Sequence, residues 1–156
     1  MAKCKQELTK DEYYMKQAIR QAKKAEKIME VPIGCVIVYE DKIIGRGYNK
    51  RNLKKTTLAH AEIIAIAKAG KVIGDWRLED CTLYVTLEPC PMCTGAIINT
   101  RIPRVVFGAG DSKGGAMGGL CDLPSFPWNH HPEIQSGVLE KECSQILKDF
   151  FRDLRE

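Results

Sequence analysis

The sequence predicts a single α/β domain in which helices cover both faces of a sheet. Apolar residues at the three-to-four spacing of buried helix positions alternate along the chain with short runs of β-branched residues. The chain has 156 residues, the length of an ordinary domain, and no repeat or linker divides residues 1–156. Hydrophobic residues make up 44% and charged residues 28%, which excludes a disordered or fibrous protein.

The first element is expected to be an amphipathic helix. Thr9 and Glu12 have the spacing of a capping box, which marks a helix start. The helix is expected to end at Val31, because Pro32 disfavours a helical conformation in the residue before it. Its apolar positions recur at helical spacing, with lysines between them, and they are Tyr14, Ala18, Ala22, Ala25 and Met29.

A β-hairpin and a second helix are expected next. Residues 34–39 and 43–48 are apolar runs rich in β-branched residues, and Glu40-Asp41 between them favours a tight turn. A polar, basic loop follows the hairpin. The second helix is expected to end at Gly70, and its apolar side chains include Ile63, Ile64, Ile66 and Ala67.

The rest of the chain continues the alternation of strands and helices. Residues 82–86 and 104–108 are predicted strands, and residues 89–99 form a helix between them with prolines in its first turn. Four glycines within residues 114–119 predict a loop. Residues 139–154 return to helical spacing, so the α/β pattern extends to the carboxyl end.

Charge and cysteine content indicate a soluble protein of the cytoplasm. The formal net charge of +4 permits an anionic partner without requiring one. No apolar segment is long enough to span a membrane, and residues 1–30 lack the pattern of a secretory signal. Seven cysteines cannot all pair, which favours a reducing compartment. There a close cysteine pair is expected to bind metal or react.

Cys90 and Cys93 form the candidate metal-binding pair. Zinc is bound by thiolates and imidazoles, and residues three apart are neighbours on one face of a helix. Pro89 and Pro91 are tolerated only in a first turn, so both cysteines are expected near the amino end of their helix. The partial positive charge of that end favours the thiolate form that a metal requires.

His60 is the candidate third ligand, and Glu62 is the candidate proton carrier. Two residues so spaced can share a site only at the tip of a helix, and Thr56 and Thr57 fit such a start as caps. A structural zinc has four protein ligands, whereas a catalytic zinc has three and leaves the fourth position to water. Glu62 is not needed as a ligand, so it is placed to take a proton from that water.

Other interpretations of the two motifs remain open. The cysteine pair could be a redox pair or ordinary helix residues, and His130 or His131 could complete a closed four-ligand site. Both motifs open a helix, however, and together they favour a catalytic zinc. No organic cofactor is expected, because Lys113 stands where a dinucleotide-binding loop would need glycine.

The pattern His-x-Glu followed by Pro-Cys-x-x-Cys is the signature of the zinc-dependent cytidine and adenosine deaminases. Over nearly its whole length the chain resembles one branch of them, the bacterial tRNA-specific adenosine deaminases of the TadA type. The resemblance lies in Val31–Gly34, Tyr48-Asn49, Ala59–Glu62, Trp76–Leu78, Thr82–Cys90, Arg101–Gly108, Asp111 with Lys113, Asn129-His130 and Phe150–Arg152. Residues 118–128 fit the family poorly.

This resemblance implies a cytidine deaminase-like fold, a three-layer α/β/α sandwich around a mixed sheet of five strands. It further implies a homodimer with one zinc ion per subunit. The implied reaction is hydrolytic deamination of adenosine to inosine at the wobble position of a tRNA-Arg anticodon. Zinc-bound hydroxide attacks the base, Glu62 carries the protons and ammonia is released.

The family's functional residues can be carried over by position. The zinc ligands would be His60, Cys90 and Cys93, and Glu62 would be the catalytic proton carrier. Asn49 would hold the target base through its amide. Leu87 would line the base pocket, and the residues that meet neighbouring anticodon nucleotides would be Asp111, Phe150 and Phe151.

The basic loop is the candidate contact to the RNA backbone. Residues 46–55 contain five basic side chains and no acidic one, in the segment that leads from Asn49 towards His60. The basic side chains are those of Arg46, Lys50, Arg51, Lys54 and Lys55. A solvated loop without a partner is the alternative for these five residues.

Two rival functions remain open. One is a deaminase of a free nucleobase or nucleoside, such as guanine or cytidine, on the same fold. The other is a non-catalytic, zinc-stabilised RNA-binding module, which would have no need of Glu62.

Overall fold

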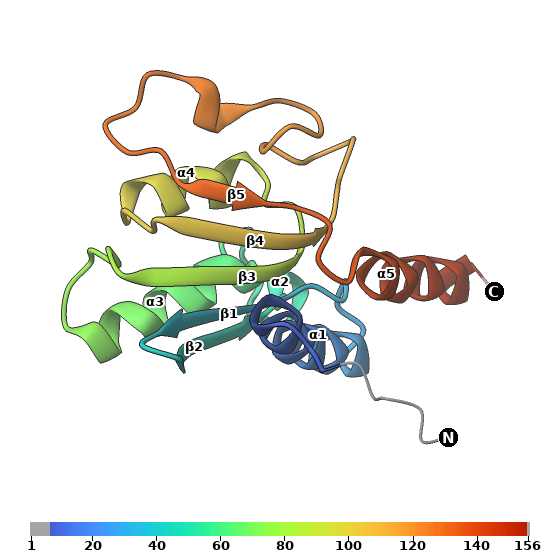
Figure 1. Ribbon diagram of the computed structural model, residues 1–156. Coiled ribbons are helices and arrows are strands. Elements are labelled where there is room, and N and C mark those ends of the chain that lie inside the picture. The colour runs from blue at the N-terminus through green and yellow to red at the C-terminus, as the bar shows by residue number, and fades with distance from the viewer. Residues whose placement is uncertain (1–6, 156) are drawn as a thin grey trace, which may run out of the picture.

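A sheet of five strands in the order β2-β1-β3-β4-β5 forms the centre of the computed structural model, which describes residues 7–155 (Figure 1). The strand β1 pairs antiparallel with β2 and β3, whereas the pairs β3–β4 and β4–β5 are parallel. The sheet is therefore mixed, as expected. The strands are β1 (Gly34–Tyr39), β2 (Lys42–Tyr48), β3 (Cys81–Leu87), β4 (Arg104–Ala109) and β5 (Glu133–Gln135).

Helices cover both faces of this sheet, which confirms the predicted three-layer α/β/α fold (Figure 1). The α-helices are α1 (Lys10–Lys27), α2 (Arg51–Lys54), α3 (Ala61–Ile73), α4 (Pro91–Asn99) and α5 (Glu140–Arg155). The helices α1 and α5 pack on one face, and α3 and α4 pack on the other. A short 3-10 helix, Leu123–Ser125, lies between β4 and β5.

The alternation of side chains along each central strand divides the core into two layers. In β1, Val36 and Val38 face α1 and α5, while Cys35 and Ile37 face α3 and α4. Because both faces are covered, the strand is apolar at nearly every position, as its sequence predicts.

Close packing brings α3 onto the β2 edge of the sheet. A Cβ atom at Gly47 would lie 2.2 Å from the carbonyl oxygen of Ala61, the first residue of α3. Only glycine therefore allows the amino end of α3 to approach β2 this closely. That amino end carries one of the two candidate catalytic motifs.

The hairpin has the predicted form. Glu40 and Asp41 are its two loop residues, and both have positive φ values, 47° and 61°. Two consecutive left-handed residues make a type I′ turn, whose twist matches that of the paired strands. The tyrosine hydroxyl of Tyr14 donates to the carbonyl oxygen of Asp41 at 2.8 Å and attaches the turn to α1.

Two predicted helix ends were wrong. The helix α1 ends at Lys27 rather than Val31, because Met29 adopts a left-handed conformation with φ 61°. The capping box at its start is present as predicted. The helix α3 passes through Gly70 and ends at Ile73, because the left-handed residue that caps it is Gly74, with φ 78°.

Two short elements were not predicted from residue patterns. The basic loop contains the helix α2, and Arg46 belongs to β2 rather than to the loop. The strand β5 has three residues and only Ile134 between two exposed ones, so it lacks a readable period. Within residues 7–155, no helix combines the length and the apolarity needed to cross a membrane.

Candidate metal centre and active site

Three metal-binding side chains converge at one point of the structure. The ligand atoms of His60, Cys90 and Cys93 all lie within 4.8 Å of one another. The Nδ1 atom of His60 is 3.6 Å from Sγ of Cys90 and 3.5 Å from Sγ of Cys93. One imidazole nitrogen and two thiolate sulfurs are a donor set that suits zinc, and a tetrahedral ion would keep one position open.

The topology of the sheet brings the two motifs together. Both β2 and β3 run antiparallel to β1, so their carboxyl ends lie at the same edge of the sheet. The chain continues from β2 to His60, the N-cap of α3, and from β3 to Cys90, the N-cap of α4. Two helix amino ends therefore face the cluster, and their partial positive charge favours thiolates.

The residue that caps the amino end of α3 differs from the one expected. His60 occupies the N-cap position of α3, so Thr56 and Thr57 are not its caps. The hydroxyl oxygen of Thr56 instead accepts a hydrogen bond from the backbone N–H of Leu58 at 3.2 Å. The imidazole makes no capping bond. It remains available for the cluster.

A closed site completed by another histidine does not form. The Nε2 atom of His130 is 2.6 Å from the carbonyl oxygen of Ile102, and Nδ1 of His131 is 3.0 Å from that of Pro124. Neither imidazole belongs to the three-residue cluster, which is the only such group within residues 7–155. The four-ligand alternative is therefore wrong for these histidines.

Hydrogen bonding within the cluster shifts the pKa values of the two cysteines in opposite directions. Hydrogen bonds from Cys93 and His60 lower the pKa of Cys90, and the hydrogen bond to Cys90 raises the pKa of Cys93. The same contact with Cys90 raises the pKa of His60. Cys90 is thus the thiol that ionises first, held by two neighbouring donors.

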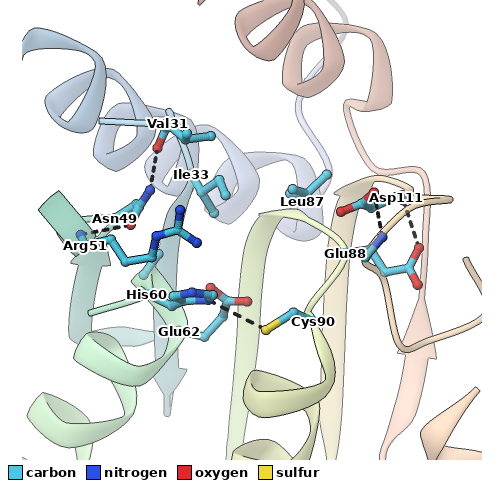
Figure 2. A pocket seen from close by; sticks show the side chains of 12 residues that line it. Val31, Ile33, Asn49, Arg51, His60, Glu62, Leu87, Glu88, Cys90 and Asp111 are labelled. Atoms are coloured by element: carbon cyan, nitrogen blue, oxygen red, sulfur yellow. Dashed lines mark hydrogen bonds between the residues drawn. The ribbon is translucent and has the colours of Figure 1, made fainter. Parts of the chain in front are cut away.

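Glu62 is buried beside the cluster without belonging to it. Its side chain is 4% exposed, and burial raises the pKa of its carboxyl group above the ordinary value. It lies in the first turn of α3, next to His60 in space (Figure 2). A buried carboxyl group that can take up and release a proton is suited to general acid–base chemistry.

The cluster opens into a pocket that encloses about 600 Å³, part of it open to solvent. Figure 2 shows the side chains that line it. The lining consists of Val31, Ile33, Asn49, Arg51, His60, Ala61, Glu62, Leu87, Glu88, Cys90, Asp111 and Gly114.

Asn49 is held rigidly in the pocket wall. Its side-chain Nδ2 donates to the carbonyl oxygen of Val31 at 3.3 Å, and its Oδ1 accepts from the backbone N–H of Arg51 at 3.2 Å. An amide has a second N–H and a second lone pair, so Asn49 keeps one donor and one acceptor for a ligand. Leu87, at the end of β3, supplies apolar surface to the same pocket.

The other predicted substrate residues are placed differently. Asp111 lines the pocket, but its Oδ1 accepts hydrogen bonds from the backbone N–H groups of Lys113 and Gly114 at 3.0 and 3.1 Å. Phe150 and Phe151 lie outside it, on α5. Their rings meet edge to face at 5.4 Å, and only Phe151 is exposed.

The basic residues lie around the pocket rather than in it. Of the five, Arg51 alone lines the pocket, while Arg46, Lys54 and Lys55 are exposed at the surface. Lys50 is half-buried and stacks over the ring of Tyr48 at 4.5 Å. Of the five positive charges, only that of Arg51 is therefore placed in the pocket wall.

Two buried carboxylates near the site were missed by sequence reasoning. Glu30 is 2% exposed, and both of its oxygens accept from the backbone N–H of Asn52 at 3.0 and 3.1 Å. This contact secures the amino end of α2 within the basic segment. Glu88 is 5% exposed and lines the pocket. The sequence offered one sign of a role for Glu88, because a charged residue there stands between an apolar strand and the Pro89-Cys90 motif.

Comparison with known proteins relates the whole chain to deaminases. A sequence model of the MafB19-like deaminases matches residues 9–155. A tRNA-specific adenosine deaminase from Bacillus subtilis is 53% identical over 150 residues, which are 96% of this chain and 93% of the relative.

Solved structures agree with this relation. One, from work on A-to-I editing by tRNA:A34 deaminases at the wobble position of transfer RNA, has a TM-score of 0.82 and 40% identity, and the match covers 86% of this chain and 99% of that one. A guanine deaminase from Nitrosomonas europaea has a TM-score of 0.73 over 93% of this chain and 86% of its own. At 19% identity that likeness concerns the fold alone.

Proposed function

Since the chain belongs to the family of the tRNA-specific adenosine deaminases, we propose that it converts adenosine to inosine at the wobble position of a tRNA-Arg anticodon. One observation carries the proposal. His60 and Cys90, two members of the cluster that Cys93 completes, line the same pocket as Glu62, a buried carboxyl group outside the cluster. A structural metal site would have no use for that fourth residue.

The three cluster residues would hold one zinc ion per subunit. Their donor atoms, one nitrogen and two sulfurs within 4.8 Å of one another, fit zinc and leave room for a water molecule. When bound, zinc supplies Lewis acidity that makes water a nucleophile at neutral pH.

Glu62 would carry the protons of the reaction. Its carboxylate takes a proton from the attacking water and gives it to the ring nitrogen beside the reacting carbon, which becomes more electrophilic. After the water oxygen has bonded to that carbon, Glu62 takes the remaining proton of this oxygen and delivers it to the amino group. The carbon–nitrogen bond then breaks, and ammonia leaves. Burial of Glu62 keeps bulk water from competing for these protons.

The remaining pocket residues would bind the target base. Asn49 offers one free amide donor and one free acceptor to the edge of the base, and its two backbone contacts fix the direction of both. Leu87 supplies apolar surface against the face of the base. Asp111 and the exposed ring of Phe151, supported by Phe150, would meet neighbouring anticodon nucleotides.

The basic segment would bind the RNA backbone. Arg51 lines the pocket, and Arg46, Lys50, Lys54 and Lys55 precede or follow it in the chain by no more than five residues, so they would meet the phosphates next to an extruded base. The unpaired bases of an anticodon loop can enter such a pocket at little cost in stacking energy.

The protein would act as a homodimer in the cytoplasm, with residues 1–156 as a single deaminase domain. Three large apolar side chains in the poorly matching segment, those of Leu120, Phe126 and Trp128, are 61%, 56% and 44% exposed. Such a surface suits contact with a second copy. Light scattering should give twice the mass of the 17.5 kDa chain, and a monomer would contradict the dimer.

The test of the function compares four substrates under identical conditions. A tRNA-Arg anticodon stem-loop should gain inosine, while free adenosine, cytidine and guanine should react far more slowly. Faster deamination of free guanine or cytidine would support the free-nucleobase enzyme. Binding of the stem-loop without any inosine would support the non-catalytic RNA-binding module.

A further inference from the structure

One buried side chain holds an entire loop of the pocket wall. The Oε1 atom of Glu88 accepts a hydrogen bond from the backbone N–H of Asp111 at 3.0 Å. Its Oε2 atom accepts from the N–H groups of Met117 and Gly119, both at 2.9 Å. The three donors lie at the start, the later part and the end of residues 111–119, so a single carboxylate fixes the path of this loop.

The glycines of the loop allow this approach. A Cβ atom at Gly115 would lie 2.2 Å from Cδ of Glu88, and one at Gly119 would lie 2.7 Å from its Oε1. The backbone therefore packs directly against the carboxylate, and larger residues would push it away. The glycine-rich composition, which predicts only a loop, has its physical reason in this contact.

The same residue joins the loop to the metal-binding segment. Glu88 precedes Cys90 by two residues, and the carbonyl oxygen of Pro89 between them accepts from the N–H of Ala116 at 2.9 Å. Asp111 and Gly114 of the loop both line the pocket, and Asp111 lies on the side away from Asn49 and His60 (Figure 2). The carboxylate thus sets the distance between this wall and the cluster.

We propose that Glu88 is a positioning residue that holds the 111–119 loop as the far wall of the pocket and thereby sets the affinity for the RNA substrate. Both of its oxygens accept hydrogen bonds from backbone N–H groups of this loop, which is the contact that a positioning role requires. The effect on RNA affinity rests on the proposed function, whereas the holding of the loop by Glu88 is independent of it.

The variants Glu88→Gln and Glu88→Asp test this role. In Gln, an NH2 group replaces one acceptor oxygen, so at least one backbone N–H loses its hydrogen bond. Asp keeps the negative charge, but its side chain is one methylene shorter and cannot reach all three donors. Asp11→Asn is the matched control, because Asp11 also accepts from three donors, Tyr84 Oη and both terminal nitrogens of Arg104, on the opposite face of the sheet.

The kinetic result separates positioning from loss of folding. With a tRNA-Arg anticodon stem-loop, Glu88→Gln should raise KM about tenfold or more, while kcat and zinc content change little. The KM of Glu88→Asp should lie between those of Glu88→Gln and the wild type. Asp11→Asn should lower the melting temperature and leave KM unchanged. Unchanged KM in Glu88→Gln, or a fall in kcat alone, would overturn the inference about affinity.

Hydrogen exchange tests the loop without any substrate. In Glu88→Gln the amides of residues 111–119 should exchange about tenfold faster or more, while those of β1 and α3 stay protected. Gly115→Ala should produce the same pattern from the opposite side of the contact. Wild-type protection of the loop in both variants would overturn its holding by Glu88. A wild-type protein that forms no inosine would instead refute the proposed function and leave this result to decide the structural part.

Discussion

The Nδ1 atom of His60 lies 3.5 Å from Sγ of Cys93, although thirty-three residues separate them in the chain. The contact exists because the amino ends of α3 and α4 meet at the same edge of the sheet. A ligand removed at this point should therefore affect both the metal content and the junction of the two helices.

Replacement of Cys90 or Cys93 by Ala should lower the zinc content well below one per chain. It should also lower the melting temperature, because bound metal stabilises the folded state that holds it. Cys121→Ser is the control, since this exposed cysteine lies outside the cluster. Elemental analysis after dialysis measures the effect. Full zinc occupancy in either alanine variant would contradict the ligand assignment.

Replacement of Glu62 by Gln should greatly lower activity without removing the metal, in contrast to the cysteine variants. Zinc content should stay near one per chain, because the carboxylate is not a ligand, while deamination should fall by about 10² to 10⁴-fold. Single-turnover formation of inosine, measured beside zinc content, separates the two effects. A variant that loses its zinc, or that reacts at nearly the wild-type rate, is incompatible with a proton carrier.

Neutralisation of Lys54 and Lys55 should weaken stem-loop binding and flatten its salt dependence by roughly one to two units of slope. Each phosphate neutralised by a lysine releases a counterion, so lost contacts reduce the slope. The control pair is Lys42→Ala with Lys71→Ala, two exposed lysines at the first residue of β2 and in the last turn of α3, whereas the pocket lies just after the last residue of β2 and at the first residues of α3. Titrations of the stem-loop at several salt concentrations measure the slope for each variant. Equal slopes for wild type and the first pair would place the RNA elsewhere.

Asn49→Ala should slow deamination of bound RNA and leave the salt slope nearly unchanged. The variant removes a contact to the base rather than to a phosphate. It also removes the acceptor for the N–H of Arg51 at the start of α2, so circular dichroism should confirm the fold. A changed slope with an unchanged rate would assign Asn49 to the backbone-binding surface.

The ion pair between Asp11 and Arg104 predicts how stability changes with pH. Hydrogen bonding to Arg104 lowers the pKa of Asp11 below its ordinary value of 3.8. A lowered pKa stabilises the folded state above the ordinary value, and this contribution disappears as the pH falls through the lowered pKa. Asp11→Asn should therefore cost about 1–2 kcal/mol near neutral pH, and less as the pH falls below the ordinary value of 3.8 and through the lowered pKa. Urea unfolding across pH measures this difference, and a constant difference at every pH would contradict it.

The helix starts of the site were predictable because their signals are local. The prolines around Cys90 and the two-residue spacing of His60 and Glu62 restrict each motif to the tip of a helix, whatever surrounds it. The helix ends were less predictable. Met29 and Gly74 end their helices by adopting left-handed conformations, and an earlier proline or glycine does not reveal which residue will do so.

The roles of the buried carboxylates could not be predicted in the same way. The donors to Glu88 are 23 to 31 residues away, and the donor to Glu30 is 22 residues away. Such contacts depend on how strands and loops come together, which no local period encodes. The four-residue helix α2 and the three-residue strand β5 are likewise set by their neighbours.

The most direct test of the account is the position of inosine in a tRNA-Arg anticodon stem-loop treated with the zinc-loaded protein. Sequencing of the product should show inosine at the wobble position alone, with none in the Glu62→Gln reaction. A second stem-loop, with its only loop adenosine moved to the next position, should remain unmodified. Inosine at equal levels in both stem-loops, or its absence from both, would contradict a wobble-specific tRNA adenosine deaminase.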